Sequence, residues 1–303
     1  MAFVFIIILA ALYLTSISSA PFLVQLNRKK RNSSKQHALF DSENITTAMV
    51  IARRRVTDIQ VTGASSAVTP TASPTYLRQT VSVTLTNVRD IYYTGPLTVN
   101  GVLFPDVLFD TGSSTLLVPA TQCCTCAQGQ IHKNRYGSGH MFFYYCSESV
   151  SFGTHKIPSY LVGAATFGNV LDGISGLAGM AWPSLDIANT IPLVTALYKQ
   201  NLIPANMFSL YLTNTNGVSC ELYLGGADTT HYTGSISWVT LVAQSWWTVN
   251  VASVSVAGKT LYSVSNQAIL DSGTSRLLGP TNAINSIIHS FGAAGISVLS
   301  QNG

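Results

Sequence analysis

Charge is scarce in this chain of 303 residues. Only 9% of its residues are Asp, Glu, Lys or Arg, against about 25% in an average soluble domain, whereas 47% are hydrophobic. This composition excludes a disordered chain, which combines few apolar residues with a high net charge. The formal net charge of +4 is too small for a typical nucleic-acid-binding protein, so we expect no nucleic-acid partner.

Long hydrophobic runs are also lacking. None approaches the ~18–20 apolar residues of a membrane-spanning helix, so we expect no membrane span in the mature chain. The apolar run from Phe3 to Leu14, followed by small and polar residues, has the length and flank of a signal-peptide core. We therefore predict a signal peptide over residues 1–19 and passage through the secretory pathway to an extracellular or lysosomal site. Asn32 and Asn44 begin glycosylation sequons, which only an exported chain can use.

The few charges are unevenly distributed. Residues 1–79 hold nine basic and three acidic residues, whereas residues 80–303 hold seven basic and nine acidic residues. A cationic front joined to a mildly anionic body indicates two parts that attract each other, although a solvated basic tail gives the same pattern. We interpret residues 20–79 as a basic propeptide.

The cysteines are few but clustered, with three of the five in the segment Cys123-Cys124-Thr125-Cys126. In an oxidising compartment such cysteines favour disulfides, and the candidates are Cys123, Cys124, Cys126 and Cys146. The odd count leaves at least one thiol without a partner in this chain. A zinc site made by Cys123, Cys124, Cys126 and His132 is the alternative, but we predict neither a metal ion nor another cofactor.

From Val81 onward, short runs of alternating apolar and polar residues predict strands. The dipeptide Asn100-Gly101 between two such runs predicts a two-residue hairpin turn. A further strand is predicted over Ile236 to Leu241, and helices only over Ile191 to Gln200 and Thr281 to Ser290. The fold class is therefore mostly β.

One eight-residue pattern occurs twice, 161 positions apart. Residues 107–114 and residues 268–275 each contain three apolar residues, then Asp, a hydroxyl residue, Gly and two further hydroxyl residues. An apolar strand that ends in Asp-Thr-Gly or Asp-Ser-Gly carries its carboxyl group to the end of a sheet, where Gly allows the backbone to turn. A single copy would indicate an ordinary turn, but two extended copies indicate paired sites.

Two such carboxyl groups in contact would share a proton, because like charges so close cannot both ionise readily. One can then act as general base toward a water molecule and the other as general acid toward a carbonyl group. The predicted catalytic residues are Asp110 and Asp271. The residues predicted to support the two loops are Thr111, Gly112, Ser113, Ser272, Gly273 and Thr274.

The chain resembles the pepsin-like aspartic endopeptidases from Val81 to Ser290. The matching motifs are Asp110-Thr111-Gly112-Ser113-Ser114, Asp172-Gly173-Ile174-Ser175-Gly176-Leu177-Ala178, Leu224-Gly225-Gly226, Tyr232-Thr233-Gly234-Ser235 with Trp238, and Asp271-Ser272-Gly273-Thr274-Ser275 with Gly279-Pro280-Thr281. The resemblance implies a bilobal β fold, with an N-terminal lobe over residues 80–232 and a partial C-terminal lobe over residues 233–303. It also implies a monomer that hydrolyses protein or peptide substrates at acidic pH and is held inactive by its own propeptide.

By the same resemblance, a hairpin tip would close over bound peptide as the flap. The residues implied for the flap and the substrate cleft are Tyr136, Gly137, Ser138, Leu108, Trp246 and Ile269. An apolar cleft would favour substrates with bulky apolar residues beside the cleaved bond.

The chain departs from the family pattern in several places. Leu117 stands where the family usually has a Trp that supports the flap Tyr. The family also has two apolar residues before a Gly behind each Asp loop, and in Ile174-Ser175-Gly176 the second of them is Ser. Tyr136 follows Asp110 by only 26 positions, so we expect an N-terminal lobe shortened before the flap. Because 32 residues follow Asp271, we expect an incomplete C-terminal lobe and a truncated or mis-spliced product, or an incomplete gene model. The alternative function is a catalytically inactive relative that at most binds peptide or glycan.

Overall fold

The computed structural model places most of the chain after residue 77 and three short strands before it. It describes residues 4–9, 48–49, 58–61, 78–89, 91–213, 218–232, 236, 238–239, 241–256, 259–275 and 278–290. The predicted glycosylation sites at Asn32 and Asn44 lie outside the described residues.

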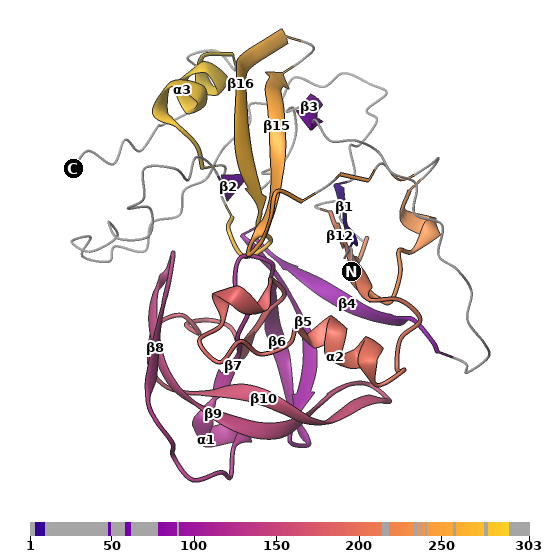
Figure 1. Cartoon of the computed structure of the whole chain (residues 1–303), viewed down its shortest axis with the longest axis vertical. Helices are drawn as coiled ribbons and strands as arrows, with labels where there is room; N and C mark the ends of the chain where they lie inside the picture. The colour runs from indigo at the N-terminus through magenta and orange to yellow at the C-terminus, as the bar shows by residue number, and fades with distance from the viewer. Residues whose placement is uncertain are drawn as a thin grey trace.

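Most strands belong to one large sheet, which forms the lower body of the molecule in Figure 1. Its strands, in spatial order, are β1 (Val4–Leu9), β12 (Met207–Leu212), β13 (Cys220–Leu224), β4 (Val81–Val88), β5 (Tyr92–Val99), β6 (Val102–Asp110), β11 (Gly176–Gly179), β7 (Leu116–Pro119), β10 (His155–Gly168), β9 (Gly139–Phe152) and β8 (His132–Tyr136). An additional pairing of β5 with β9 folds the sheet back on itself. We call this body the first lobe.

A smaller sheet stands above the first lobe (Figure 1) and forms what we call the second lobe. Its strands are β14 (Ala243–Gln244), β15 (Trp247–Val256), β16 (Lys259–Leu270), β2 (Ala48–Met49) and β3 (Asp58–Val61). The long hairpin β15–β16 is its main element, and helix α3 (Thr281–Ser290) packs against β16. The structure thus has two lobes, joined where β6 and β16 end.

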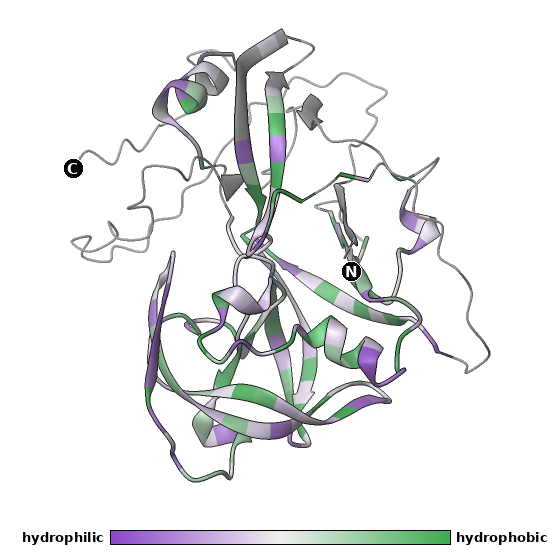
Figure 2. Ribbon diagram, in the orientation of Figure 1, coloured by the Kyte–Doolittle hydropathy of each residue, from purple (hydrophilic) through white to green (hydrophobic). Residues whose placement is uncertain are grey.

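The alternating sequence explains how the strands are buried. Along β4, residues 81 to 86 alternate between buried and exposed, and the alternation of apolar and polar residues is visible in Figure 2. The buried faces meet in one large core that includes Phe104, Phe109 and Leu197. The predicted turn at Asn100-Gly101 is confirmed, since both residues have the positive φ angles, 50° and 78°, that this hairpin turn requires.

The helices are short, as the sequence predicts. They are α1 (Ala120–Cys123), α2 (Leu193–Lys199) and α3, with single 3-10 turns η1 (Pro183–Leu185) and η2 (Thr229–His231). The predicted strand over Ile236 to Leu241 is wrong, because the described residues of that segment form no strand. Val239 and Leu241 instead pack from a loop against an apolar cluster of Val249, Val251 and Ala268 in the second lobe.

Tryptophans join the two lobes. Trp247 begins β15 but its ring lies in the core of the first lobe, with its centroid 5.5 Å from that of Trp182 and 5.6 Å from that of Phe208. Its indole N–H donates to the backbone oxygen of Met180 over 3.1 Å. This contact holds the start of the β15–β16 hairpin to the first lobe and so helps to set the position of the second Asp motif, which follows β16.

Three strands fall within the predicted signal peptide and propeptide. β1 pairs in parallel with β12, β2 pairs with β16, and β3 pairs with β15. The cleavage of these segments stays a prediction. Among the described residues, no helix has the length and apolar character needed to cross a bilayer.

Candidate active site

The two repeated motifs lie at the ends of two strands that belong to different lobes. Asp110 is the last residue of β6, and Asp271 directly follows β16. The chain turns immediately after each of them. The structure therefore brings together the two carboxyl groups whose pairing the repeated motif predicts.

The first loop holds its own carboxylate from two sides. The backbone N–H of Gly112 donates to Asp110 Oδ1 over 2.8 Å, and the Ser113 hydroxyl donates to Asp110 Oδ2 over 2.5 Å. Both bonds span two or three residues, so the local sequence alone fixes the orientation of the carboxyl group.

The second loop repeats this arrangement. The N–H of Gly273 donates to Asp271 Oδ1 over 2.8 Å, and the Thr274 hydroxyl donates to Asp271 Oδ2 over 2.6 Å. The match of donor, acceptor and distance makes the two loops a structural as well as a sequence repeat.

Hydrogen bonds also cross between the loops. Thr111 Oγ1 donates to the backbone oxygen of Leu270 over 2.9 Å and accepts the N–H of Ser272 over 2.8 Å. In return, Ser272 Oγ donates to the backbone oxygen of Phe109 over 2.5 Å and accepts the N–H of Thr111 over 3.0 Å. These four reciprocal bonds fix the two strand ends relative to each other, and Thr111 is fully buried.

The two glycines show how closely the loops approach. A Cβ atom on Gly112 would lie 2.6 Å from the carboxyl atoms of Asp271, and one on Gly273 would lie 2.2 Å from Asp110 Oδ1. Only glycine allows this contact, because real Cβ atoms do not come within 3.0 Å of such neighbours. Each carboxyl group is therefore packed directly against the turn that carries the other.

Burial and like charge act together on the first carboxyl group. Asp110 is 7% exposed, whereas Asp271 is partly exposed. Burial, followed by the negative charge of Asp271, raises the pKa of Asp110 well above its ordinary value. The pair consequently retains a proton at a pH where an isolated carboxyl group would have lost it.

Strand β11 supports the first loop from behind. It pairs in parallel with β6, and beyond its end the N–H of Met180 donates to the backbone oxygen of Asp110 over 2.7 Å. Gly179 is required there, because a Cβ atom would lie 2.4 Å from the backbone of Ser114. Ser175, unusual for its position, accepts the N–H of Asp106 with its side-chain oxygen over 2.8 Å.

The hairpin β8–β9 carries the predicted flap residues. Tyr136 pairs with Gly139, so Gly137 and Ser138 form an exposed two-residue tip. The ring of Tyr136 packs on an apolar cluster that contains Leu108 and Leu117, and burial raises the pKa of its phenol group above the ordinary value. Its hydroxyl oxygen is buried and has no hydrogen-bond partner among the described residues.

The remaining predicted cleft residues are mostly covered. Leu108 is 8% exposed beneath the β8–β9 hairpin, and Ile269 is 7% exposed on β16. Trp246 is partly exposed, and its indole N–H donates to the backbone oxygen of Gly112 over 3.2 Å. Trp246 thus anchors the first loop directly.

Two polar residues near the site could not be predicted from the sequence. Asp186 is buried and accepts hydrogen bonds from the hydroxyls of Thr115 and Tyr145 and from the N–H of Thr190. Asn169 bonds to the tip of the β8–β9 hairpin. No motif in the sequence marks either residue. Their hydrogen-bond partners lie 4 to 71 positions away along the chain, at spacings that follow no regular pattern.

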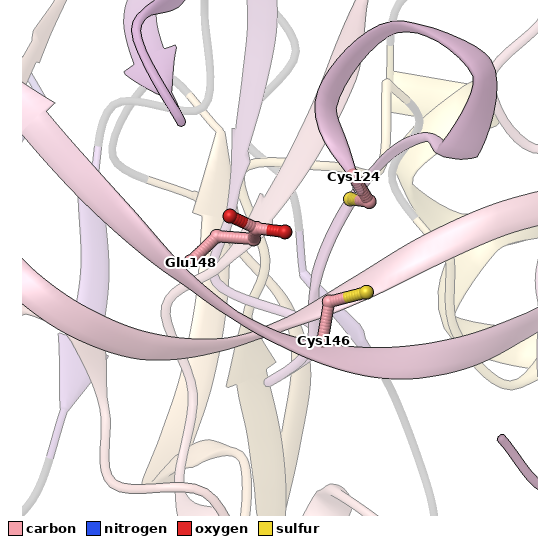
Figure 3. Close-up of side chains that lie close together, drawn as sticks. All are labelled: Cys124, Cys146 and Glu148. Atoms are coloured by element: carbon pink, nitrogen blue, oxygen red, sulfur yellow. The ribbon is translucent and has the colours of Figure 1, made fainter. Parts of the chain in front are cut away.

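Two groups of potential metal ligands occur among the described residues. Cys124, Cys146 and Glu148 lie close together (Figure 3), but both sulfur atoms are bonded in the disulfides Cys123–Cys124 and Cys126–Cys146. Those cysteines therefore offer no thiolate to a metal ion. The fifth cysteine, Cys220, is a buried free thiol. The second group is Glu221, Asp228 and His231, in which the His231 Nε2 atom lies 2.9 Å from Glu221 Oε2.

Comparisons with known proteins agree with this geometry. The family model described as eukaryotic aspartyl protease matches residues 102–300. Pepsin II-2/3 of Oryctolagus cuniculus is 32% identical over 219 residues, which cover 65% of this chain and 56% of the relative. Pepsin A of Rhinolophus ferrumequinum is 32% identical over 251 residues, which cover 72% of this chain and 64% of the relative.

A solved structure has the same fold. The aspartic proteinase from Irpex lacteus superposes with a TM-score of 0.62 at 23% identity, covering 70% of this chain and 68% of that chain. The match to the two pepsins spans somewhat more than half of their lengths. From the family model, which covers well over half of the sequence, and from the paired Asp loops, the chain belongs to the eukaryotic aspartyl protease family.

Proposed function

We propose that this chain is an aspartic endopeptidase that hydrolyses peptide bonds in proteins at acidic pH with a water molecule activated by Asp110 and Asp271. The observation that carries the proposal is the reciprocal approach of the two loops, in which each glycine packs against the opposite carboxyl group. A pair of carboxyl groups so arranged offers one acid and one base within reach of the same water molecule.

The proposed roles follow from the difference in burial. Asp110 is the more buried residue and its pKa is raised, so the shared proton resides on Asp110. Asp271 then carries the negative charge and takes a proton from the water molecule, whose oxygen bonds to the carbonyl carbon of the substrate while Asp110 donates its proton to the carbonyl oxygen. In the resulting tetrahedral species the C–N bond breaks, the amine leaves with the proton held by Asp271, and a hydroxyl group of the species returns a proton to Asp110. Because the base must be ionised while its partner is protonated, only the singly protonated pair is active, and the raised pKa of Asp110 keeps the acid protonated at acidic pH.

The neighbouring residues have supporting roles in this proposal. Thr111, Gly112, Ser113, Ser272, Gly273 and Thr274 orient the two carboxyl groups through the bonds described above. Tyr136, Gly137 and Ser138 form the flap over the substrate, and Trp246, Leu108 and Ile269 contribute to the apolar surroundings of the cleft. No cofactor takes part.

We also propose that the protein is made as a secreted zymogen and acts as a monomer in an extracellular or lysosomal compartment. The signal-peptide pattern predicted from the sequence over residues 1–19 and the excess of basic residues over residues 20–79 support this. The basic segment would cover the cleft of the mildly anionic body and act as an intramolecular inhibitor until acid protonates the carboxylates that hold it.

The experiment is an assay of the full chain on a denatured protein at pH 3–4, with the variants Asp110→Asn and Asp271→Asn. Each variant should lose activity by at least about 10³-fold while its circular dichroism and melting temperature stay close to those of the unmodified chain. Activity that survives either substitution would refute the proposal. If the unmodified chain binds peptides but does not cleave them, the inactive-relative alternative holds.

A further inference from the structure

The tip of the β8–β9 hairpin has an unusual set of anchors. The hydroxyl group of Tyr136, just before the tip, has no hydrogen-bond partner among the described residues, and its ring packs on the apolar cluster that contains Leu108 and Leu117. Leu117, which lies in the same apolar cluster, has no polar atom in its side chain to offer. The polar contacts that position the tip therefore have to come from elsewhere.

Asn169, the residue after β10, makes three hydrogen bonds to the β8–β9 hairpin, one to Ser138 in the tip and two to His140 just beyond it. Its backbone N–H donates to the His140 oxygen over 3.2 Å, and its side-chain Oδ1 accepts the His140 N–H over 3.3 Å. Its Nδ2 donates to the Ser138 oxygen over 3.3 Å. The side-chain amide thus takes the place of a backbone amide and extends the β9–β10 pairing beyond Gly168, the last paired residue of β10.

Two glycines make room for this contact. Gly139 has a φ angle of +151°, and a Cβ atom there would lie 2.0 Å from Asn169 Oδ1. Gly168 has a φ angle of +143°, and a Cβ atom there would lie 2.3 Å from the His140 oxygen. At both positions, only a glycine leaves room for the contact between the hairpin and the segment after β10. A chance surface contact would not require a glycine on each side.

We propose that Asn169 is a positioning residue that fastens the tip of the β8–β9 hairpin and thereby sets how firmly the flap closes over bound peptide. The link to peptide binding rests on the proposed function, whereas the fastening of the tip does not. Asn169 acts through Ser138 and His140, and no direct contact with substrate is required. Since the hairpin contacts would form in the enzyme–substrate complex and persist in the transition state, their loss should weaken binding more than the chemical step.

The chemistry of the side chain gives a sharp test. The contact needs one donor and one acceptor, and an amide supplies both, whereas a carboxylate supplies acceptors only. A protonated carboxyl group again has one donor and one acceptor. In the variant Asn169→Asp, the tip should therefore be fastened at low pH and released as the pH rises through the pKa of the new carboxyl group, which is about 3.9 for an unperturbed Asp.

The first experiment measures hydrogen exchange in residues 136–142 of the full chain without substrate, for the unmodified protein and three variants. We expect exchange at the His140 amide to become about fivefold to tenfold faster in Asn169→Ala, as loss of a modest hydrogen bond implies. Asn169→Asp should resemble Asn169→Ala at pH 6 and the unmodified protein at pH 3, after correction for the intrinsic exchange rate. Asn250→Ala, which changes an exposed asparagine on β15, is the control and should leave residues 136–142 unchanged.

Unchanged exchange in Asn169→Ala, or exchange in Asn169→Asp that does not depend on pH beyond the intrinsic effect, would overturn the proposal. If Asn169→Ala fails to fold, the pH dependence of Asn169→Asp still decides the question.

The second experiment measures peptide hydrolysis at pH 3 and pH 5. Asn169→Ala should raise KM about fivefold at both values with kcat changed less than twofold. Asn169→Asp should raise KM at pH 5 alone. A fall in kcat with KM unchanged would contradict a positioning role. The two hypotheses can fail separately, because activity that survives Asp110→Asn refutes the proposed function, whereas unchanged exchange at His140 refutes the fastening alone.

Discussion

The bonds that cross between the two loops can be tested by the substitution Thr111→Val. Valine has nearly the same shape as threonine but cannot bond, and Thr111 is fully buried, so no water can replace the lost hydroxyl. The substitution leaves two backbone groups without partners, namely the N–H of Ser272 and the oxygen of Leu270.

The magnitude follows from these two groups. An unsatisfied buried donor or acceptor costs about 1–3 kcal/mol, and the gain from the more apolar side chain offsets part of this. We therefore expect the free energy of unfolding to fall by about 2–4 kcal/mol, and kcat/KM to fall because the two carboxyl groups are no longer held in register.

The assay is urea denaturation followed by tryptophan fluorescence, with a matched control at Thr94. Thr94 is also buried, but its hydroxyl has no hydrogen-bond partner among the described residues, so Thr94→Val should be neutral or stabilising. Equal effects at the two positions would refute the reasoning, because the difference between them is the pair of bonds that cross between the loops. A coupling energy near zero between Thr111→Val and Ser272→Ala would refute it as well.

Three further predictions concern the surroundings of the site. Tyr136→Phe should change the unfolding free energy by less than about 0.5 kcal/mol and kcat/KM by less than about twofold, since the lost hydroxyl has no partner, whereas Tyr136→Ala should lower kcat/KM at least about tenfold. Asp186→Asn should lower the unfolding free energy by about 1.5–3 kcal/mol in urea denaturation, because three donors converge on that carboxylate, while Asp106→Asn on the exposed surface should have almost no effect. Because the pKa of Asp110 is raised to about 8 on folding, the folded chain holds a proton that the unfolded chain loses near pH 3.9, so the stability that this residue contributes falls as the pH rises from about 3.9 to the folded pKa. Denaturation at pH 4 and pH 7 should show a smaller pH dependence in Asp110→Asn, and an unchanged dependence would contradict the shift.

Much of the fold follows from local patterns. Strand β4 alternates with period two, the turn at Asn100-Gly101 has the expected φ angles, and α3 begins and ends where the sequence predicts. The paired loops follow from the repeat, because each carboxyl group is held mainly by donors within three residues of it.

The parts that could not be predicted depend on contacts between distant segments. Asp186 gives no signal that Thr115 and Tyr145 will converge on it, and Asn169 looks like an ordinary loop residue until its side chain meets His140. The mistaken strand at Ile236 to Leu241 has the same origin, since local alternation cannot reveal whether a neighbouring strand is available to pair.

The most direct measurement is an NMR titration of the carboxyl carbons of ¹³C-labelled aspartate in the full chain. The paired loops predict that Asp110 titrates with a pKa well above the ordinary value of about 3.9, and that this shift becomes smaller but persists in Asp271→Asn, since burial is its larger cause. Titration of Asp110 near 3.9, unchanged by Asp271→Asn, would mean that the two groups share no proton and would contradict the proposed catalytic pair.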